Sequence, residues 1–116
     1  MTRDINDFLE DILAYSEKAS EIVNRVDIHS LTEFSTDSLA IIRCLEVIGE
    51  ATKQIPDKIR EQYPEIPWKK VAGLRDILIH KYWAADMTRL IETVKDFMPP
   101  LQKVVQQILK DLNTES

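Results

Sequence analysis

The amino-acid sequence predicts an all-α fold, an antiparallel bundle of four or five helices. Apolar residues repeat at helical spacing along most of the 116 residues. No segment shows a sustained alternation of apolar and polar residues, and the chain has no Asn-Gly or Asp-Gly pair of the kind typical of β-hairpins. It has only two glycines and five prolines, too few for a sandwich or barrel with many tight turns. The length fits one domain, which we expect to span residues 1–116.

The first helix is expected over residues 5–26, where apolar residues recur every three or four positions. Acidic residues at its start suit the positive end of the helix dipole. Residues 27–38 are rich in Ser, Thr and Asp, which favour turns and helix N-caps. We interpret this stretch as a connection that Leu31 and Phe34 hold to the core.

The second helix is expected over residues 36–54, and Pro56 ends it. Its apolar residues cover more than one face, which is typical of a helix that is central in a bundle or faces another subunit. Cys44 lies among these apolar residues and is expected to be an inert core thiol. A single stripe of polar residues remains, which suits a row of salt bridges along the helix. This stripe consists of Arg43, Glu46, Glu50 and Lys53.

The middle of the chain predicts a short helix over residues 57–63, closed by Pro64. Pro67 suits the first position of the next helix, because the N–H that proline lacks has no partner there. That helix is expected to run over residues 68–82.

The last helical segment is expected to follow Asp86, which suits its N-cap. Its apolar residues keep helical spacing as far as Leu112. Pro99 and Pro100 lie inside this pattern and predict a kink or break, because proline removes a helical hydrogen bond and its ring crowds the preceding turn. Residues 113–116 are expected to fray.

The charge of the chain is uneven. Lys and Arg number 15 and Asp and Glu number 20, for a net charge of −5, so any contact with nucleic acid must be local. Residues 68–83 carry four basic residues and one acidic residue, and this local charge of +3 leaves −8 for the remainder. The segment also holds both tryptophans, and such a segment suits an anionic ligand such as RNA or a nucleotide. The alternative is a charged outer face with aromatic residues packed inward. The candidates for contacts with the RNA backbone are Lys69, Lys70 and Lys81.

Arg75 and His80 are the candidate functional pair in this segment. Arg75 lies in an apolar stripe, where a guanidinium needs a partner such as Glu46 or Glu50, and a structural ion pair is the alternative to a functional role. His80 lies five residues later, about 140° around an ideal helix and roughly 7.5 Å along it. One copy of the pair would not converge on a single phosphate. Two copies across a two-fold axis could line one shared cleft, so a functional pair predicts a homodimer.

Other kinds of site find no support in the sequence. One cysteine and two distant histidines do not make a typical zinc site, and no glycine-rich phosphate loop or EF-hand loop is present. We therefore expect no metal and no cofactor. No apolar run approaches the roughly 20 residues of a membrane span, and the N-terminus does not read as a signal peptide. The single cysteine excludes an internal disulfide and is compatible with a reducing compartment, so we expect a cytoplasmic protein with no membrane partner.

The segment Arg75-Asp-Ile-Leu-Ile-His80-Lys-Tyr82 resembles the R-x4-H-x-Y motif of the HEPN superfamily, in its HepT-like branch. Two flanking blocks are similar to that branch as well, Arg43-Cys-Leu-Glu-Val-Ile-Gly-Glu-Ala51 and Ile66-Pro-Trp-Lys-Lys-Val-Ala-Gly-Leu74. The motif alone is a short signal, whereas the two blocks in the same order make the resemblance specific. It spans nearly the whole chain.

The resemblance implies a HEPN-like bundle that dimerises with its two motifs facing each other. It implies a metal-independent endoribonuclease, the toxin of a type VII-like HepT/MntA toxin–antitoxin pair, with Arg75 and His80 catalytic. The implied antitoxin is an MNT-type nucleotidyltransferase that inhibits the toxin by adding AMP to Tyr82. Asp76 stands where such motifs often have Asn, and we expect Asp76 and Glu50 to support the site.

The implied chemistry fits these side chains. His80 titrates near neutral pH and can act as general base or acid, and Arg75 can stabilise charge on a phosphate through two hydrogen bonds. Three hypotheses follow: a ribonuclease toxin, a non-catalytic module that binds a nucleotide or a nucleotidyltransferase, and a helical scaffold. They predict, in turn, loss of cleavage in His80→Ala, binding without cleavage, and a lower melting temperature in Arg75→Ala.

Overall fold

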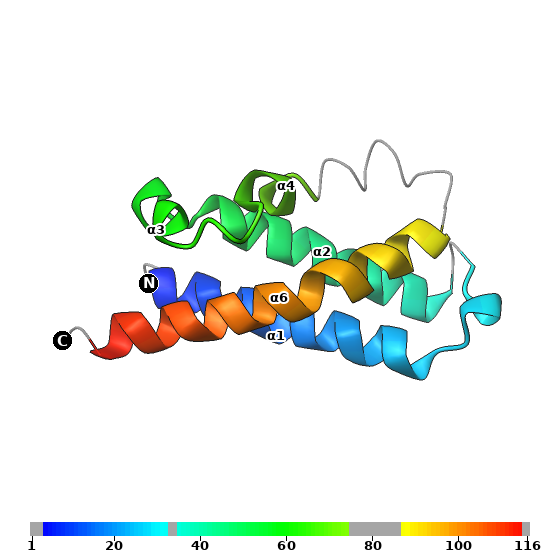
Figure 1. Cartoon of the computed structure of the whole chain (residues 1–116). Coiled ribbons are helices and arrows are strands. Elements are labelled where there is room, and N and C mark those ends of the chain that lie inside the picture. The colour runs from blue at the N-terminus through cyan, green and yellow to red at the C-terminus, as the bar shows by residue number, and fades with distance from the viewer. Residues whose placement is uncertain (1–3, 33–34, 75–86, 115–116) are drawn as a thin grey trace.

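The computed structural model describes residues 4–32, 35–74 and 87–114. These ranges hold five α-helices and a short 3-10 helix but no strand, so the all-α prediction is confirmed (Figure 1). The elements are α1 (Ile5–Arg25), η1 (Ile28–Ser30), α2 (Thr36–Lys53), α3 (Asp57–Gln62), α4 (Trp68–Ala72) and α6 (Met87–Thr114). The predicted core residue Phe34 and the predicted cap Asp86 lie outside the described residues.

Three long helices, α1, α2 and α6, form the body of the bundle (Figure 1). Helix α1 packs against both α2 and α6 and runs antiparallel to each. Helices α2 and α6 run in the same direction, because both begin at the same end of the bundle. Among the described helices, α1 lies between α2 and α6, and α2 lies between α1 and α4, so the interpretation of α2 as a central helix stays a prediction. The other interpretation, that α2 faces a second subunit, stays a prediction.

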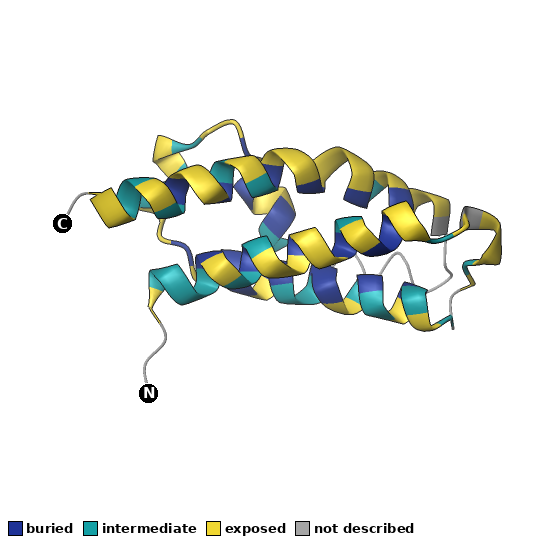
Figure 2. Cartoon of the chain, turned by 90° about the horizontal axis from the view of Figure 1, so that it is seen from below, coloured by how far each residue is buried: buried dark blue, intermediate teal, exposed yellow. Residues whose placement is uncertain are grey.

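Helix α1 begins and is buried as its sequence predicts. The Asp7 N–H donates to Asp4 Oδ1 at 3.1 Å, and the Asp4 N–H donates to Asp7 Oδ2 at 3.2 Å, which completes a reciprocal cap. One stripe of the helix faces the core, as the alternation of buried and exposed positions in Figure 2 shows. Ser16 lies in that stripe, and its hydroxyl donates to the Leu13 carbonyl at 2.9 Å, so the buried Ser16 hydroxyl is paired.

Helix α2 has one fully buried face and one partly exposed face. Ser35 caps it by accepting from the Ser38 N–H at 3.2 Å. Leu45 and other large apolar residues of α2 are fully buried, but Leu39 is 52% exposed. Leu31, in the connection before the helix, packs against the core as predicted.

The predicted helix over residues 68–82 is shorter in the described part of the chain. Helix α4 ends at Ala72, because Gly73 leaves the helical conformation, although its N–H still makes the helical hydrogen bond to the Lys69 carbonyl at 3.1 Å. Pro67 takes the N-cap position just before the first helical residue, not the first helical position. Beyond Leu74, the predicted helix lies outside the described residues.

Helix α6 continues through Pro99 and Pro100, so of the predicted kink or break the break is wrong, and the kink stays a prediction. The carbonyls that lose their helical donors belong to Lys95 and Asp96, and both of these residues and both prolines are exposed. Water can satisfy such carbonyls, so the cost of proline falls on the solvent side of the helix while the core side stays packed. The predicted fraying from residue 113 is also wrong at its start, because the helix extends to Thr114.

Candidate functional site

The predicted R-x4-H-x-Y motif belongs to the stretch of chain between α4 and α6. Its predicted site residues lie outside the described residues: Arg75, Asp76, His80, Lys81 and Tyr82. The structure describes the three other predicted site residues, Glu50 on α2 and Lys69 and Lys70 on α4. It also describes the contacts that hold α4, which leads directly into the motif, against the bundle.

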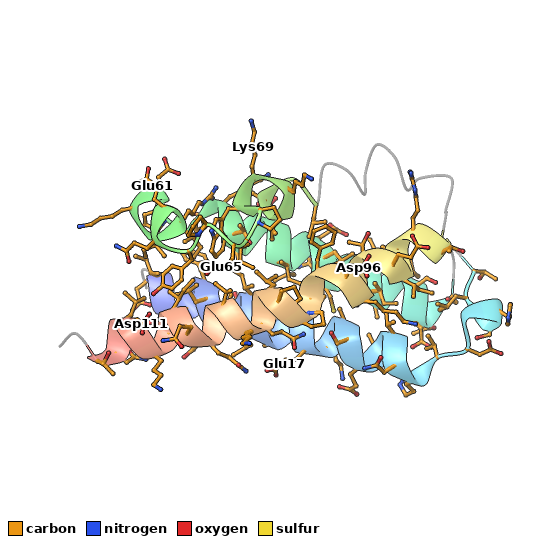
Figure 3. The ribbon with its side chains drawn as sticks, in the orientation of Figure 1. Glu17, Glu61, Glu65, Lys69, Asp96 and Asp111 are labelled. Carbon is orange, nitrogen blue, oxygen red and sulfur yellow. The ribbon has the colours of Figure 1, made fainter. Side chains whose placement is uncertain are left out.

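The two lysines of α4 are exposed. In this short helix Trp68 and Val71 are buried, whereas Lys69 and Lys70 between them face solvent. Figure 3 shows Lys69 pointing away from the bundle. Helix α4 therefore has the predicted buried aromatic side chain and the predicted exposed charges. Its two lysines can be reached by an anionic ligand.

Glu50 lies in the last turn of α2 and is exposed. Its Oε1 is 3.6 Å from the Nζ of Lys53, which places one ion pair of the predicted polar stripe. Both side chains are well exposed, so this pair contributes only about 0.3–0.5 kcal/mol to stability. The predicted pairing of Glu46 or Glu50 with Arg75 involves a residue outside the described ranges and stays a prediction.

Glu50 also borders a hollow of about 350 Å³ between α1 and α2. Apolar side chains and charged groups of both signs line this hollow. Its lining residues are Phe8, Asp11, Arg43, Val47, Glu50, Ala51 and Gln54. Glu50 therefore faces an open recess, where a second side chain or a ligand can reach it.

Arg60, on α3, joins this short helix to the end of α2. Its Nη2 donates to the Thr52 carbonyl at 2.6 Å, and its Nε donates to the Ile55 carbonyl at 2.9 Å. The Thr52 carbonyl belongs to the last turn of α2, where helical carbonyls have no helical partner and the helix dipole favours a cation, and Ile55 follows just after the helix. The sequence pattern contains no signal for this role of Arg60, because both of its partners are backbone carbonyls.

Tyr63, just after α3, joins the same segment to α6. Its hydroxyl donates to Asp111 Oδ2 at 2.5 Å, and its carbonyl accepts from the Trp68 indole Nε1 at 2.9 Å. The other carboxylate oxygen of Asp111 accepts from Gln107 at 2.7 Å. These hydrogen bonds, that of Tyr63 first, hold the pKa of Asp111 below its usual value. Sequence analysis missed this contact, because two polar residues 48 positions apart leave no periodic signal.

Cys44 is a free thiol buried in the core, as predicted. Burial raises its pKa, which disfavours the reactive thiolate. Within the described ranges, His, Cys, Asp and Glu side chains form no group of three that could hold a metal ion. The helices described are also too short or too polar to cross a membrane.

The sequence is similar over most of its length to proteins named as ribonucleases. The profile of the family described as "Ribonuclease HepT-like" matches residues 12–108. The Methanocaldococcus jannaschii protein named "Putative RNase MJ0125" is 46% identical over 110 residues, which cover 95% of each chain. The Thermococcus cleftensis protein named "Probable ribonuclease HepT" is 37% identical over 110 residues, 95% of this chain and 100% of the relative. No solved structure matches the chain significantly.

The matched region begins in α1 and ends in α6. It contains Glu50, both lysines of α4 and the complete segment from Arg75 to Tyr82. The family match therefore covers the helices of the bundle and every residue of the candidate site. This chain belongs to the ribonuclease HepT-like family.

Proposed function

We propose that this protein is a metal-independent endoribonuclease that acts as a cytoplasmic homodimer and as the toxin of a HepT/MntA-type toxin–antitoxin pair. The observation that carries the proposal is the R-x4-H-x-Y sequence from Arg75 to Tyr82 inside the region matched by the ribonuclease family. A histidine can transfer protons and an arginine can stabilise the charge on the phosphate, which are the two tasks of RNA cleavage without a metal ion.

The proposed reaction is attack of the ribose 2′ oxygen on the adjacent phosphorus. His80 accepts the 2′-hydroxyl proton, while Arg75 donates hydrogen bonds to the phosphate oxygens and stabilises the charge that develops there. The bond from phosphorus to the 5′ oxygen breaks, and a protonated imidazole supplies the proton that this oxygen takes up. The products are a 2′,3′-cyclic phosphate and a 5′-hydroxyl. Asp76 and Glu50 support this site.

We propose that two subunits build the site together, because Arg75 and His80 of one subunit are too far apart on an ideal helix to contact the same phosphate. Two subunits related by a two-fold axis bring two copies of the pair to one cleft. Leu39 supports an interface on α2, because it is a large apolar residue that is 52% exposed. We expect a second subunit to cover it.

Local positive charge draws RNA to the site of this acidic protein. Lys69 and Lys70 are exposed on α4, and Lys81 lies within the motif segment. We propose that these three lysines contact the phosphate backbone, which makes binding weaken as the salt concentration rises.

We propose that an MNT-type nucleotidyltransferase regulates the enzyme through Tyr82. Transfer of AMP from ATP to the phenolic oxygen would release pyrophosphate and leave a phosphodiester two residues from His80. The added bulk and negative charge would then repel RNA from the site.

An RNA cleavage assay in the presence of EDTA tests this function. We expect wild-type protein, shown by mass spectrometry to carry no AMP, to cut RNA and His80→Ala to lose cleavage while keeping its circular dichroism and its dimer. His29→Ala is the matched control, because His29 lies in the exposed η1 turn and outside the motif. Equal cleavage by wild type and His80→Ala would show a contaminating nuclease. An inactive, unmodified dimer would favour the non-catalytic binding module instead.

A further inference from the structure

We propose that Tyr63 and Asp111 are positioning residues, whose hydrogen bond sets the place of α4 and so of the catalytic segment that follows it. This inference rests on the proposed function, and it gives Tyr63 and Asp111 a role that acts through α4 and not through contact with RNA. One contact between α6 and the α3–α4 segment (residues 57–72) would then determine the position of the site.

The α3–α4 segment has little core of its own. None of the residues of α3 is buried, the loop after it buries Ile66, and α4 buries only Trp68 and Val71. In Figure 1 both short helices lie on the outside of the long helices. Because apolar burial is non-directional, two buried side chains permit α4 to slide or tilt unless directional contacts prevent it.

Tyr63 provides two such contacts at once. Its hydroxyl reaches Asp111 on α6, and its carbonyl accepts from the indole of Trp68, which is the first residue of α4. One residue thus connects the last long helix to the start of α4. The Tyr63 N–H in turn donates to the Arg60 carbonyl at 3.1 Å, which closes α3 and fixes the backbone from which both contacts arise.

A neighbouring side chain on α6 orients the Asp111 carboxylate for this contact. Gln107, one turn earlier on α6, donates to Oδ1 and leaves Oδ2 directed at the Tyr63 hydroxyl. The carboxylate is ionised near neutral pH, and an ionised acceptor makes a stronger and more directional bond than a neutral one. The acceptor therefore belongs to the long helix α6, and the α3–α4 segment is the part that this contact positions.

The position of α4 matters because of what it carries. Lys69 and Lys70 lie within it, and Arg75 follows its last residue by only three positions. A shift of the helix by about 1 Å would move the entry to the catalytic segment by a similar amount, enough to cost an enzyme about tenfold to a hundredfold in rate. Long, exposed lysine side chains can absorb such a shift, so RNA binding should suffer less than the chemical step.

Kinetics and hydrogen exchange of Tyr63→Phe and Asp111→Ala test the proposal, both measured well below the melting temperature. We expect kcat to fall about tenfold with KM within about twofold of wild type, because the lost contact orients the site without binding RNA. Amides of residues 66–74 should exchange faster in both variants. The double variant should lose no more than the worse single variant, because both substitutions break one bond.

Ser20→Ala is the matched control. Ser20 on α1 accepts a hydrogen bond from Gln102 of α6 at 3.1 Å, so its loss also breaks a long-range side-chain contact of α6, but one remote from α4. It should leave kcat and the exchange of residues 66–74 as in wild type. If Tyr63→Phe behaves like Ser20→Ala in both measurements, the proposal is wrong. An inactive wild type would overturn the proposed function alone, since the exchange of residues 66–74 would still decide whether Tyr63 holds α4.

Discussion

The long-helix bundle and the α3–α4 segment are held in place by different forces. Helices α1, α2 and α6 share a core of fully buried aliphatic side chains that runs the length of the bundle. The α3–α4 segment adds to this core only Ile66, Trp68 and Val71. It is attached instead by hydrogen bonds from Arg60 to the end of α2 and from Tyr63 to α6.

This difference separates stability from placement. A large apolar core supplies most of the free energy of folding but tolerates small shifts of its helices. Hydrogen bonds contribute less free energy, yet they depend steeply on distance and angle. The part of the molecule that leads into the proposed catalytic segment is thus the part whose position depends on directional contacts.

The largest effect is expected in the bundle itself. Leu45 is fully buried on α2, so Leu45→Ala should lower the free energy of unfolding by about 2–5 kcal/mol. Lys53→Ala is the matched control on the same helix, because Lys53 is exposed and its ion pair with Glu50 contributes little, so this variant should lose less than about 0.5 kcal/mol. Urea unfolding followed by circular dichroism measures both. Equal losses would mean that the buried face of α2 is assigned wrongly.

A smaller effect is expected where α3 joins α2. Arg60→Ala removes the cation from the C-terminal carbonyls of α2 and should cost about 1–2 kcal/mol. Arg25→Ala breaks an exposed ion pair with Asp37 and should cost less than about 0.5 kcal/mol. Lysine at position 60 should restore little, because an ammonium lacks the planar fork that reaches two carbonyls. Comparable losses in the two arginine variants would make Arg60 an ordinary surface residue.

The same division explains how far the sequence predicts the structure. Periodic burial is a local signal, so the bounds of α1 and α2 and the core positions of α6 could be predicted closely. The helix break predicted as one alternative at Pro99 and Pro100 is absent, because the cost of a proline depends on whether its face meets solvent, and that is a tertiary property. At the site, the exposure of Lys69 followed from the sequence, whereas the Tyr63 contact depends on a partner 48 residues away.

The two regions should also open separately. We expect α4 to unfold locally at urea concentrations at which the bundle stays closed, because it buries few side chains. Trypsin should then cut after Lys69 or Lys70 while Cys44, buried and with a raised pKa, still resists alkylation. Ser20→Ala should not change the order of the two events, and Tyr63→Phe should bring tryptic cleavage to lower urea. Simultaneous cleavage and alkylation would instead indicate one cooperative unit.

The smallest effect concerns pH and isolates the Tyr63 contact. The pKa of Asp111 is lowered in the folded protein, so the unfolded chain takes up the proton first as the pH falls. The stabilisation by Asp111 is therefore complete above its unfolded pKa of about 4 and is lost as the pH drops through the lower folded value. The difference in urea midpoint between wild type and Tyr63→Phe should accordingly be larger at pH 7 than at pH 3. The difference for Ser20→Ala should stay constant, because neither Ser20 nor Gln102 titrates. A Tyr63→Phe difference that is the same at both pH values would mean that the carboxylate charge adds nothing to the contact.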